Sequence, residues 1–539
     1  MQPIRLIALF SLQVVCYSMC GTLIAGDSPY YEIHGYGTQT EGGLSGEVIR
    51  VTNLDNYGDG SLRQAIGTPG ARLVVFEVGG VIDLEMNNIS VSNPYLTVAG
   101  QTAPAPGITL IKGGLTVRTH DVVIQHLAVR PGDAGQLPQS GWEPDAIATS
   151  GNEAYNVVFD HCSATWAVDE NLSVSGPGDS EPMASSHDVT LYRCIIAECL
   201  SYSTHSKGQH SMGTLLHDGV ANVSIIGCLY AHNNARNPYY KGNSRAVVVN
   251  NVVYNSGHNC VHMSDYGTNS AVIIGKSYGA LVGNVWIKGV DSSTDIFVRA
   301  TKSRACGEAY LEDNILKDRT GADMEAVDSY IQVVDSPPLW PEGLVARPAV
   351  EAVFSVLKSA GARAGDRDAI DARIVQAAIN GTGEIIDSQG EVGGYPSYTM
   401  TTRSIEVPEG TEARRAWLDS LSAAIDTDDA LDTSPLNPVL GTISVSERQI
   451  PQEYGLALTN YPNPFNPVTR IDYTVSRPGY VLLTVFSLTG QEIATLVDKR
   501  QQAGRYHIYF QASGLPSGVY FYQLRVGDAV ITKKMTILK

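Results

Sequence analysis

The stretch NVVFDHCSA, residues 156–164, decides the fold class because it is one copy of a recurring segment. Related β-rich runs, each entered by a polar residue, are DVVIQHLAV from Asp121, DVTLYRCII from Asp188, NVSIIGCLY from Asn222 and RAVVVNNVVY from Arg245. The first four begin 35, 32 and 34 residues apart, and the fifth follows 23 residues later. No helical pattern of useful length separates them, which disfavours βαβ crossovers. Strands that recur in this way predict the coils of a parallel β-helix.

The register of these segments indicates what lies inside the coils. Six residues after each start stand Leu127, Cys162, Cys194, Cys228 and Asn251. In a stacked solenoid the three cysteines would form an inward ladder of small apolar groups. A metal site is the alternative, but it needs ligands that converge at one level. Asn251, Asn284 and Asn314 suit turns or an asparagine stack between coils.

The flanks of the repeat predict helices and a linker. SLRQAI at 61–66 is typical of a short helix capped by Ser61, which would plug the open end of the solenoid. Helical periodicity returns at 348–380 and again near 411–425. The interval 426–455 is polar and bears Pro, Ser and Asp, so we expect a linker there.

A second β unit is predicted at 456–539. Its candidate strands are separated by the turn signals LTGQ, LPSG and VGDA, and they are YTVS, YVLLTVFSL, EIATLVD, RYHIYFQA, GVYFYQLRV and AVITKKMTIL. Six or seven short strands in so few residues indicate a small antiparallel sandwich.

Composition and the N-terminus indicate an exported globular protein. Hydrophobic content of 43% and charged content of 17% are typical of a folded chain, and the net charge of −18 argues against a nucleic-acid binder. Residues 1–25 predict a signal peptide, because Arg5 precedes the apolar run LIALFSLQVVC, which is too short to span a membrane. We expect a secreted or surface-attached protein without a transmembrane segment, and a monomer.

A local excess of cations interrupts this acidic chain between residues 205 and 245. The basic side chains there are Lys207, Arg236, Lys241 and Arg245, with His205, His210, His217 and His232. Asp218 is the only acid in the interval. A groove lined in this way would attract a polyanion despite the global charge. Scattered solvated charges are the alternative interpretation.

A cluster of acids lies upstream of these cations. Glu143 and Asp145 stand in WEPDAIAT, Asp160 in FDHCSATW, and Asp169 and Glu170 in AVDENLS. Carboxylates from adjacent coils could meet and hold Ca²⁺. An acid/base pair for glycoside hydrolysis is the second interpretation, and helix or turn capping is the third. Cations facing Ca²⁺ would suit β-elimination on a uronate, since both neutralise its carboxylate while a base removes the adjacent proton.

Several motifs together resemble the pectate lyases of polysaccharide lyase family 1. The resemblance extends from HGYGTQTEGG at 34 to GEVGGYPSY ending at 398, and its motifs are NPYLTVAGQTAPAPGITL, HLAVRPGD, FDHCSATWAVDENLSVS, CIIAECL, HSKG and YAHNNARNP. It implies a right-handed parallel β-helix over 26–425, with a helical C-terminal extension. It also implies Ca²⁺-dependent β-elimination of polygalacturonate, or pectate, to 4,5-unsaturated oligogalacturonides. The alternatives are a polygalacturonan hydrolase on this fold and a non-catalytic pectin-binding surface protein.

The resemblance also implies roles for individual residues. Arg236, which opens an R-x-P-x-x-R pattern, is similar to the proton-abstracting base, and Lys241 stands at the position of the pattern's second arginine. Lysine keeps the charge but loses the bidentate fork. Lys207 in HSKG is similar to the lysine that binds the substrate carboxylate. The implied Ca²⁺ ligands are Asp145 and Asp169, and this chain has Thr165 where the family usually offers a further carboxylate.

Glu143 and Glu170 are the candidates to replace that missing carboxylate, and we take Glu170 as the third expected metal ligand.

The C-terminal unit resembles a second family. NYPNPFNPVTRIDY, VFSLTGQEI, LPSGVYFY and the terminal KKMTILK are similar to type IX secretion sorting domains. These are Ig-like β-sandwiches, and the resemblance implies an outer-membrane export machine as a partner. A carbohydrate-binding module is the alternative, but the last of the five tryptophans, Trp417, precedes this unit.

Overall fold

The structure, a computed structural model, divides into two compact units, Met1–Thr442 and Ile443–Lys539. It describes residues 34–440 except 177–184, 268–271 and 302–304, and residues 458–538 except 462, 464, 476–478, 489–490, 502–503, 513 and 527–528. The predicted signal peptide, residues 1–25, lies outside the described residues. Among the helices that are described, none has the length and hydropathy needed to cross a membrane.

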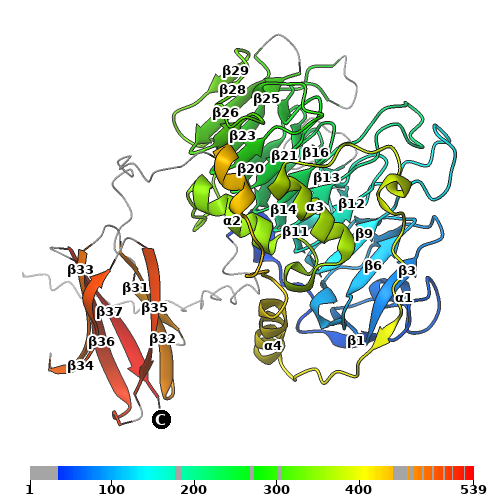
Figure 1. The fold of residues 1–539 in the computed structure, drawn as a ribbon. Coiled ribbons are helices and arrows are strands. Elements are labelled where there is room, and N and C mark those ends of the chain that lie inside the picture. The colour runs from blue at the N-terminus through cyan, green and yellow to red at the C-terminus, as the bar shows by residue number, and fades with distance from the viewer. Residues whose placement is uncertain are drawn as a thin grey trace, which may run out of the picture. The chain divides into compact units, whose positions relative to one another are not determined.

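The first unit is a parallel β-helix, as predicted, whose coils advance from blue to green in Figure 1. Its described strands form three sheets. The first sheet runs β1 (Glu47–Val51), β2 (Arg72–Phe76), β5 (Leu96–Ala99), β8 (Val122–Gln125), β11 (Tyr155–Asp160), β14 (His187–Tyr192), β17 (Ala221–Ile226), β20 (Arg245–Val249), β23 (Ser277–Val282), β26 (Gly307–Glu312) and β29 (Ile331–Val333). The second runs β28 (Glu325–Val327), β25 (Ile296–Ala300), β22 (Val261–Met263), β19 (Tyr239–Tyr240), β16 (Leu215–Leu216), β13 (Leu172–Ser175), β10 (Ile147–Ser150), β7 (Leu115–Val117) and β4 (Ile89–Val91). The third runs β27 (Ile315–Lys317), β24 (Val285–Ile287), β21 (Val252–Tyr254), β18 (Leu229–Ala231), β15 (Ile195–Ala197), β12 (Ser163–Thr165), β9 (Leu127–Arg130), β6 (Ile108–Ile111) and β3 (Val78–Asp83), with β30 (Thr401–Thr402) added antiparallel.

Each recurring segment contributes two strands, because a corner residue with positive φ divides it. These corner residues include His126 (φ 55°), His161 (φ 49°), Arg193 (φ 50°) and Gly227 (φ 67°). A left-handed residue turns the chain sharply from the first sheet to the third. Corner side chains of successive coils therefore stack on one outer edge of the solenoid.

The interior confirms the predicted ladders. Cys162, Cys194 and Cys228 are fully buried free thiols on successive coils, as the register of the strands that follow them requires. Burial raises the pKa of the Cys162 and Cys194 thiols well above the usual value. An asparagine stack follows on the later coils. The Asn251 amide donates to Asn284 Oδ1 and the Asn284 amide to Asn314 Oδ1, each at 3.0 Å.

The predicted helices are present. Helix α1 (Leu62–Gly67) begins after Ser61, whose hydroxyl accepts from the Gln64 N–H, and its apolar side packs on the first coils. Helices α2 (Ala349–Ser359) and α3 (Ala369–Asn380) pack on the third sheet (Figure 1), and α4 (Thr411–Ala423) buries Leu418 against the first sheet. The remaining helices of the described residues are the short η1 (Tyr36–Gln39), η2 (Gly100–Thr102), η3 (Ala364–Asp366), η4 (Gln389–Val392), η5 (Ser434–Leu436) and α5 (Asn437–Leu440).

The linker predicted at 426–455 is wrong over its first half. Leu436 and Leu440 lie four residues apart on η5 and α5, so both face the same side. They are buried among the apolar residues where α2 and α3 pack on the third sheet. The polar composition of this segment concealed these two apolar contacts. Residues 441–455 lie outside the described part of the chain.

The second unit is the predicted antiparallel sandwich. One sheet contains β31 (Leu458–Tyr461), β32 (Val468–Val475) and β35 (Gly504–Gln511). The other contains β34 (Glu492–Gln501), β33 (Gly479–Ser487), β36 (Gly518–Val526) and β37 (Ala529–Ile537). Inward residues of both sheets, such as Ile471, Leu483 and Met535, form one buried core.

Candidate active site

The candidate site lies where the strands of the second sheet begin. There the loops that lead into four successive strands lie side by side. Strand β10 pairs with β13 so that Ile147 lies beside Leu172, and Asp145 and Glu170 each stand two residues earlier. Bridges from Glu170 to Met212 and from Met212 to Ala235 continue the same level. Parallel register therefore brings together residues that are up to 91 positions apart, from Asp145 to Arg236.

Three of the expected metal ligands converge at this edge. Carboxylate oxygens of Asp145, Asp169 and Glu170 lie within 4.8 Å of one another. Asp145 is held by the backbone N–H of Glu170, which donates to its Oδ1 at 3.0 Å, and by the Ser173 hydroxyl, which donates to its Oδ2 at 2.7 Å. The donor set is all oxygen, which is the set that Ca²⁺ prefers.

The electrostatics of this cluster favour a cation. Burial and the neighbouring Asp169 raise the pKa of Asp145 to about 7. Burial also acts to raise the pKa of Asp169, but the hydrogen bond and charge of His210 and the charge of Arg236 bring it below its usual value. Like charges at this separation repel each other. A bound divalent cation would relieve that repulsion, so the donor set fits Ca²⁺.

Arg236 faces the carboxylates. Its guanidinium forms an ion pair with Glu170, whose side chain is 5% exposed, while that of Arg236 is 21% exposed. The guanidinium carbon also lies 5.7 Å from the centre of the Tyr239 ring. Burial lowers the pKa of Arg236, against the opposing effect of Asp169, Tyr239 and Asp145. Burial and the neighbouring acidic groups thus act on the pKa of Arg236 in opposite directions.

Two histidines complete the acidic side of the site, and the sequence interpretation had placed them only in the cationic patch. His210 Nε2 lies 2.6 Å from Asp169 Oδ1, and His205 Nε2 lies 3.7 Å from the same oxygen. Their rings stack with centroids 3.9 Å apart. His205 Nδ1 also lies 3.6 Å from Glu143 Oε1. The spacing H-x₄-H in HSKGQH was the available signal, but it does not reveal the carboxylate opposite.

The two candidate glutamates occupy different positions. Glu170 belongs to the carboxylate cluster, whereas Glu143 Oε1 accepts from the backbone N–H of Ser206 at 2.7 Å. Hydrogen bonds from the side chain and then the backbone of Ser206 lower the pKa of Glu143, and they connect the loop before β10 to the HSKG loop. Thr165, at the family's usual carboxylate position, is buried on β12, and its hydroxyl has no hydrogen-bond partner among the described residues.

The two expected substrate lysines differ in their surroundings. Lys207 is exposed on the loop between β15 and β16, and its backbone N–H donates to His205 Nδ1 at 3.1 Å. Lys241 follows β19 and is mostly buried, with Nζ 3.3 Å from Asp218 Oδ1. Burial lowers its pKa, although Asp218 opposes the shift. The structure thus brings Arg236 to the acids, keeps Lys207 on the open loop, and pairs Lys241 with Asp218.

Known proteins similar to this chain include several named probable pectate lyase C. A probable pectate lyase C of Emericella nidulans is 33% identical over 405 residues, which cover 73% of this chain and 85% of the relative. The protein of the same name from Aspergillus flavus is 32% identical over 73% of this chain and 89% of the relative. The protein from Aspergillus terreus is 36% identical over 55% of this chain, and the match spans 62% of that relative's length, which is less than two thirds.

Two further comparisons concern the C-terminal unit and the fold. Residues 459–538 match the family model of the secretion system C-terminal sorting domain. The solved structure of jun a 1, the major allergen from cedar pollen, aligns with a TM-score of 0.43 and 17% identity over 59% of this chain and 90% of that one.

Proposed function

Because this chain belongs to the pectate lyase family of polysaccharide lyases, we propose that it cleaves polygalacturonate by Ca²⁺-dependent β-elimination to 4,5-unsaturated oligogalacturonides. The observation that carries the proposal is the position of Arg236, which faces the cluster of Asp145, Asp169 and Glu170 across one edge of the second sheet. A group that can take a proton, placed opposite carboxylates that could hold a cation, is an arrangement suited to elimination beside a carboxylate.

The three carboxylates would hold the Ca²⁺. When bound, Ca²⁺ would neutralise the uronate carboxylate and so make the neighbouring C5 proton easier to remove. Asp145 is oriented by Ser173 and by the Glu170 N–H, and Asp169 is oriented by His210. These contacts fix the ligand oxygens in place without occupying all their lone pairs.

Arg236 would take the proton from C5. The electron pair of the C5–H bond becomes the C4–C5 double bond, and the glycosidic oxygen leaves C4 with the electrons of the C4–O bond and takes a proton from solvent. A guanidinium is normally protonated, but burial of Arg236 disfavours its charged form. Glu170 opposes this effect through the ion pair. If Glu170 also binds the metal ion, its ion pair with Arg236 would stabilise the charged guanidinium less.

The two lysines would bind the acidic chain of the substrate. Lys207 is exposed on a loop fastened to the acidic side, so its ammonium is free to approach a uronate carboxylate. Lys241 is less accessible and is oriented by Asp218. As a point charge it would attract the polyanion rather than grip one carboxylate with two parallel bonds.

The chain is a secreted or cell-surface protein, given its C-terminal sorting domain. We propose that this domain directs it to a type IX secretion machine at the outer membrane, with residues 1–25 serving as the signal for the earlier export step. The partner of the second unit would then be that machine, and pectate would be the ligand of the first unit alone.

The test is an assay of polygalacturonate cleavage with and without a chelator. We expect UV-absorbing unsaturated products, loss of activity on chelation, and recovery when Ca²⁺ is restored. New reducing ends without UV absorbance would instead identify a hydrolase, and binding without cleavage would identify a pectin-binding surface protein.

A pair of variants assigns the base. Arg236→Ala should lower kcat by about 10²–10⁴-fold, the range for loss of a general base, while Ca²⁺ binding persists. The matched control is Arg245→Ala, since Arg245 stacks over Tyr278 on the first sheet, away from the acids. Near-normal turnover by Arg236→Ala would remove the base assignment without removing the lyase activity.

A further inference from the structure

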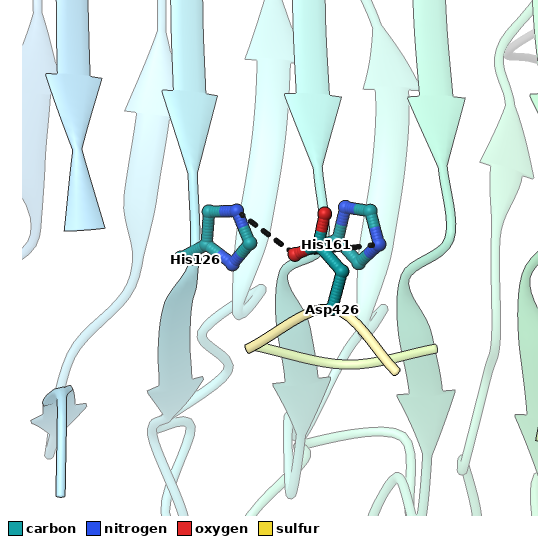
Figure 2. Close-up of side chains that lie close together, drawn as sticks. All are labelled: His126, His161 and Asp426. Atoms are coloured by element: carbon teal, nitrogen blue, oxygen red, sulfur yellow. Dashed lines mark ion pairs between the residues drawn. The ribbon is translucent and has the colours of Figure 1, made fainter. Parts of the chain in front are cut away.

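A second cluster of potential metal ligands lies on another edge of the β-helix. Corner residues His126 and His161 belong to neighbouring coils, and Asp426 approaches both from the segment after α4 (Figure 2). Asp426 Oδ1 lies 3.6 Å from His126 Nε2 and 4.0 Å from His161 Nε2. The side chains of His126 and His161 are 0% and 4% exposed, and that of Asp426 is 20% exposed. This edge joins the first and third sheets, whereas the candidate active site lies on the second.

The outer contacts of the histidines engage Nδ1 of each ring and leave both Nε2 atoms near Asp426. His126 Nδ1 lies 2.8 Å from the Ala362 carbonyl, which can only accept, so Nδ1 carries the proton. His161 Nδ1 lies 2.6 Å from Asp160 Oδ1, and Asp160 in turn accepts from the Gln125 amide at 2.8 Å. A carboxylate behind a histidine is the usual support of a metal-ligating imidazole.

Two buried polar atoms at the centre are left without hydrogen-bond partners. Among the described residues, neither His161 Nε2 nor Asp426 Oδ1 has one, and both atoms are inaccessible to solvent. A buried acceptor facing a buried imidazole lone pair is costly unless something lies between them. The site thus offers an imidazole nitrogen and a carboxylate oxygen that are both buried and both lack a partner among the described residues.

We propose that His126, His161 and Asp426 bind a transition-metal dication, with Zn²⁺ as the best match, which fastens the end of the helical tail to the β-helix. Tetrahedral Zn²⁺ places neighbouring ligand atoms about 3.4 Å apart, slightly less than the distances to Asp426 Oδ1. Ser422 Oγ lies 3.0 Å from His126 Nε2 and is the nearest candidate for a fourth donor. The imidazole rings are parallel within 9° and 5.1 Å apart, as one coil spacing dictates.

The charges around the cluster allow a dication. Asp160, Arg193 and Asp419 act on Asp426 electrostatically, and Arg363 acts on His126, so three acids and two arginines lie at or near the site. Asp426 would ligate the ion and Asp160 hydrogen-bonds to His161, so both carboxylates offset the charge of Zn²⁺. The imidazole donors favour Zn²⁺ over Ca²⁺, which prefers oxygen.

The experiment measures Zn²⁺ binding by the purified full chain. Asp169, His205 and His210 form another group that could gather Zn²⁺, so every variant also carries His210→Ala. The metal-free protein is titrated with Zn²⁺ against a chromophoric competitor, and Co²⁺ is added in parallel to record the visible spectrum of a histidine-ligated ion. The test variants are Asp426→Asn and His161→Ala, and the control is His187→Ala, because His187 also pairs with its neighbouring Asp188 but belongs to no group of three potential ligands among the described residues.

We expect the His210→Ala parent and the His187→Ala control to bind one Zn²⁺ and to gain thermal stability from it. Asp426→Asn and His161→Ala should weaken Zn²⁺ binding by more than the about 100-fold that loss of an outer-shell partner causes, and should lose the Co²⁺ spectrum. If His161→Ala does not fold, Asp426→Asn decides alone, because Asp426 lies on the peripheral segment. No Zn²⁺ binding by the parent, or equal binding by parent and Asp426→Asn, would overturn the proposal. Neither result bears on pectate cleavage.

Discussion

Replacing Arg130 by methionine should destabilise the β-helix unit far more than the loss of an ordinary surface ion pair. Arg130 ends β9, and its side chain is 0% exposed. It donates to Asp368 at 2.6 and 3.2 Å and to Asp371 at 2.8 Å, and so connects the third sheet to the start of α3. A methionine side chain is similar in size to that of arginine, so the substitution removes the charge and the hydrogen bonds with little change in volume.

The expected cost follows from what the substitution leaves behind. The side chains of Asp368 and Asp371 are 9% and 4% exposed, so both carboxylates would stay buried without their cation. Removing one partner of a buried pair costs about 3–5 kcal/mol in the free energy of unfolding. The control, Arg50→Met, breaks a pair with Glu77 in which the arginine side chain is 39% exposed, and such pairs contribute about 0–1 kcal/mol.

The cost should depend on pH in a defined direction. Burial acts to raise the pKa of Asp368, but the charge and hydrogen bond of Arg130 bring it below the usual value. A lowered carboxyl pKa stabilises the fold above the unfolded pKa of about 3.9 and loses that effect as pH falls through the folded value. Burial already raises the pKa of Asp371, and without Arg130 this pKa would rise further. In the variant the buried carboxyl group can therefore take up a proton as pH falls, which reduces the loss of stability. The difference from wild type should therefore be largest near neutral pH and shrink toward pH 4.

Tryptophan fluorescence during urea unfolding is the assay, because it observes one unit. All five tryptophans precede the second unit, at Trp142, Trp166, Trp286, Trp340 and Trp417. Curves are collected from folded and unfolded starting samples to establish equilibrium. Arg130→Met with Asp371→Asn should recover part of the loss, since the second change removes a stranded charge. A cost for Arg130→Met within 1 kcal/mol of the Arg50→Met cost, or one independent of pH, would refute the reasoning.

Three further predictions concern the site and the core. Asp169→Asn should weaken Ca²⁺ binding measured by calorimetry and abolish pectate cleavage; unchanged Ca²⁺ affinity would exclude Asp169 as a ligand. Lys241→Ala should raise KM for polygalacturonate about tenfold at low salt and less at high salt, with kcat little changed, because a screened attraction is lost; a fall in kcat alone would contradict this role. Asn284→Leu should cost about 1–3 kcal/mol in urea unfolding, because it leaves buried partners in the asparagine stack unsatisfied, and a neutral result would show that the stack adds no stability.

The sequence alone was sufficient for the architecture, because the β-helix is specified by local repetition. Each coil carries its own strands, and a constant offset places Cys162, Cys194 and Cys228 at equivalent positions. Helices α2, α3 and α4 were predictable for the same reason, since their periodicity is contained within each segment. The types of residue in the site could also be predicted, because the sequence itself shows a group of acidic residues followed by a group of basic residues.

Only the tertiary structure decided which of these groups meet. Loops of unequal length separate the strands, so the level of a loop residue follows from pairing register and not from its sequence number. That register brings Glu170 to Arg236, and it places His205 and His210 against Asp169, a contact that the sequence interpretation missed. Packing of the tail brings Asp426, from a segment predicted to be a linker, to His126 and His161 about 300 and 265 positions earlier in the chain. Contacts over such separations depend on how the tail packs, and no local pattern encodes that packing.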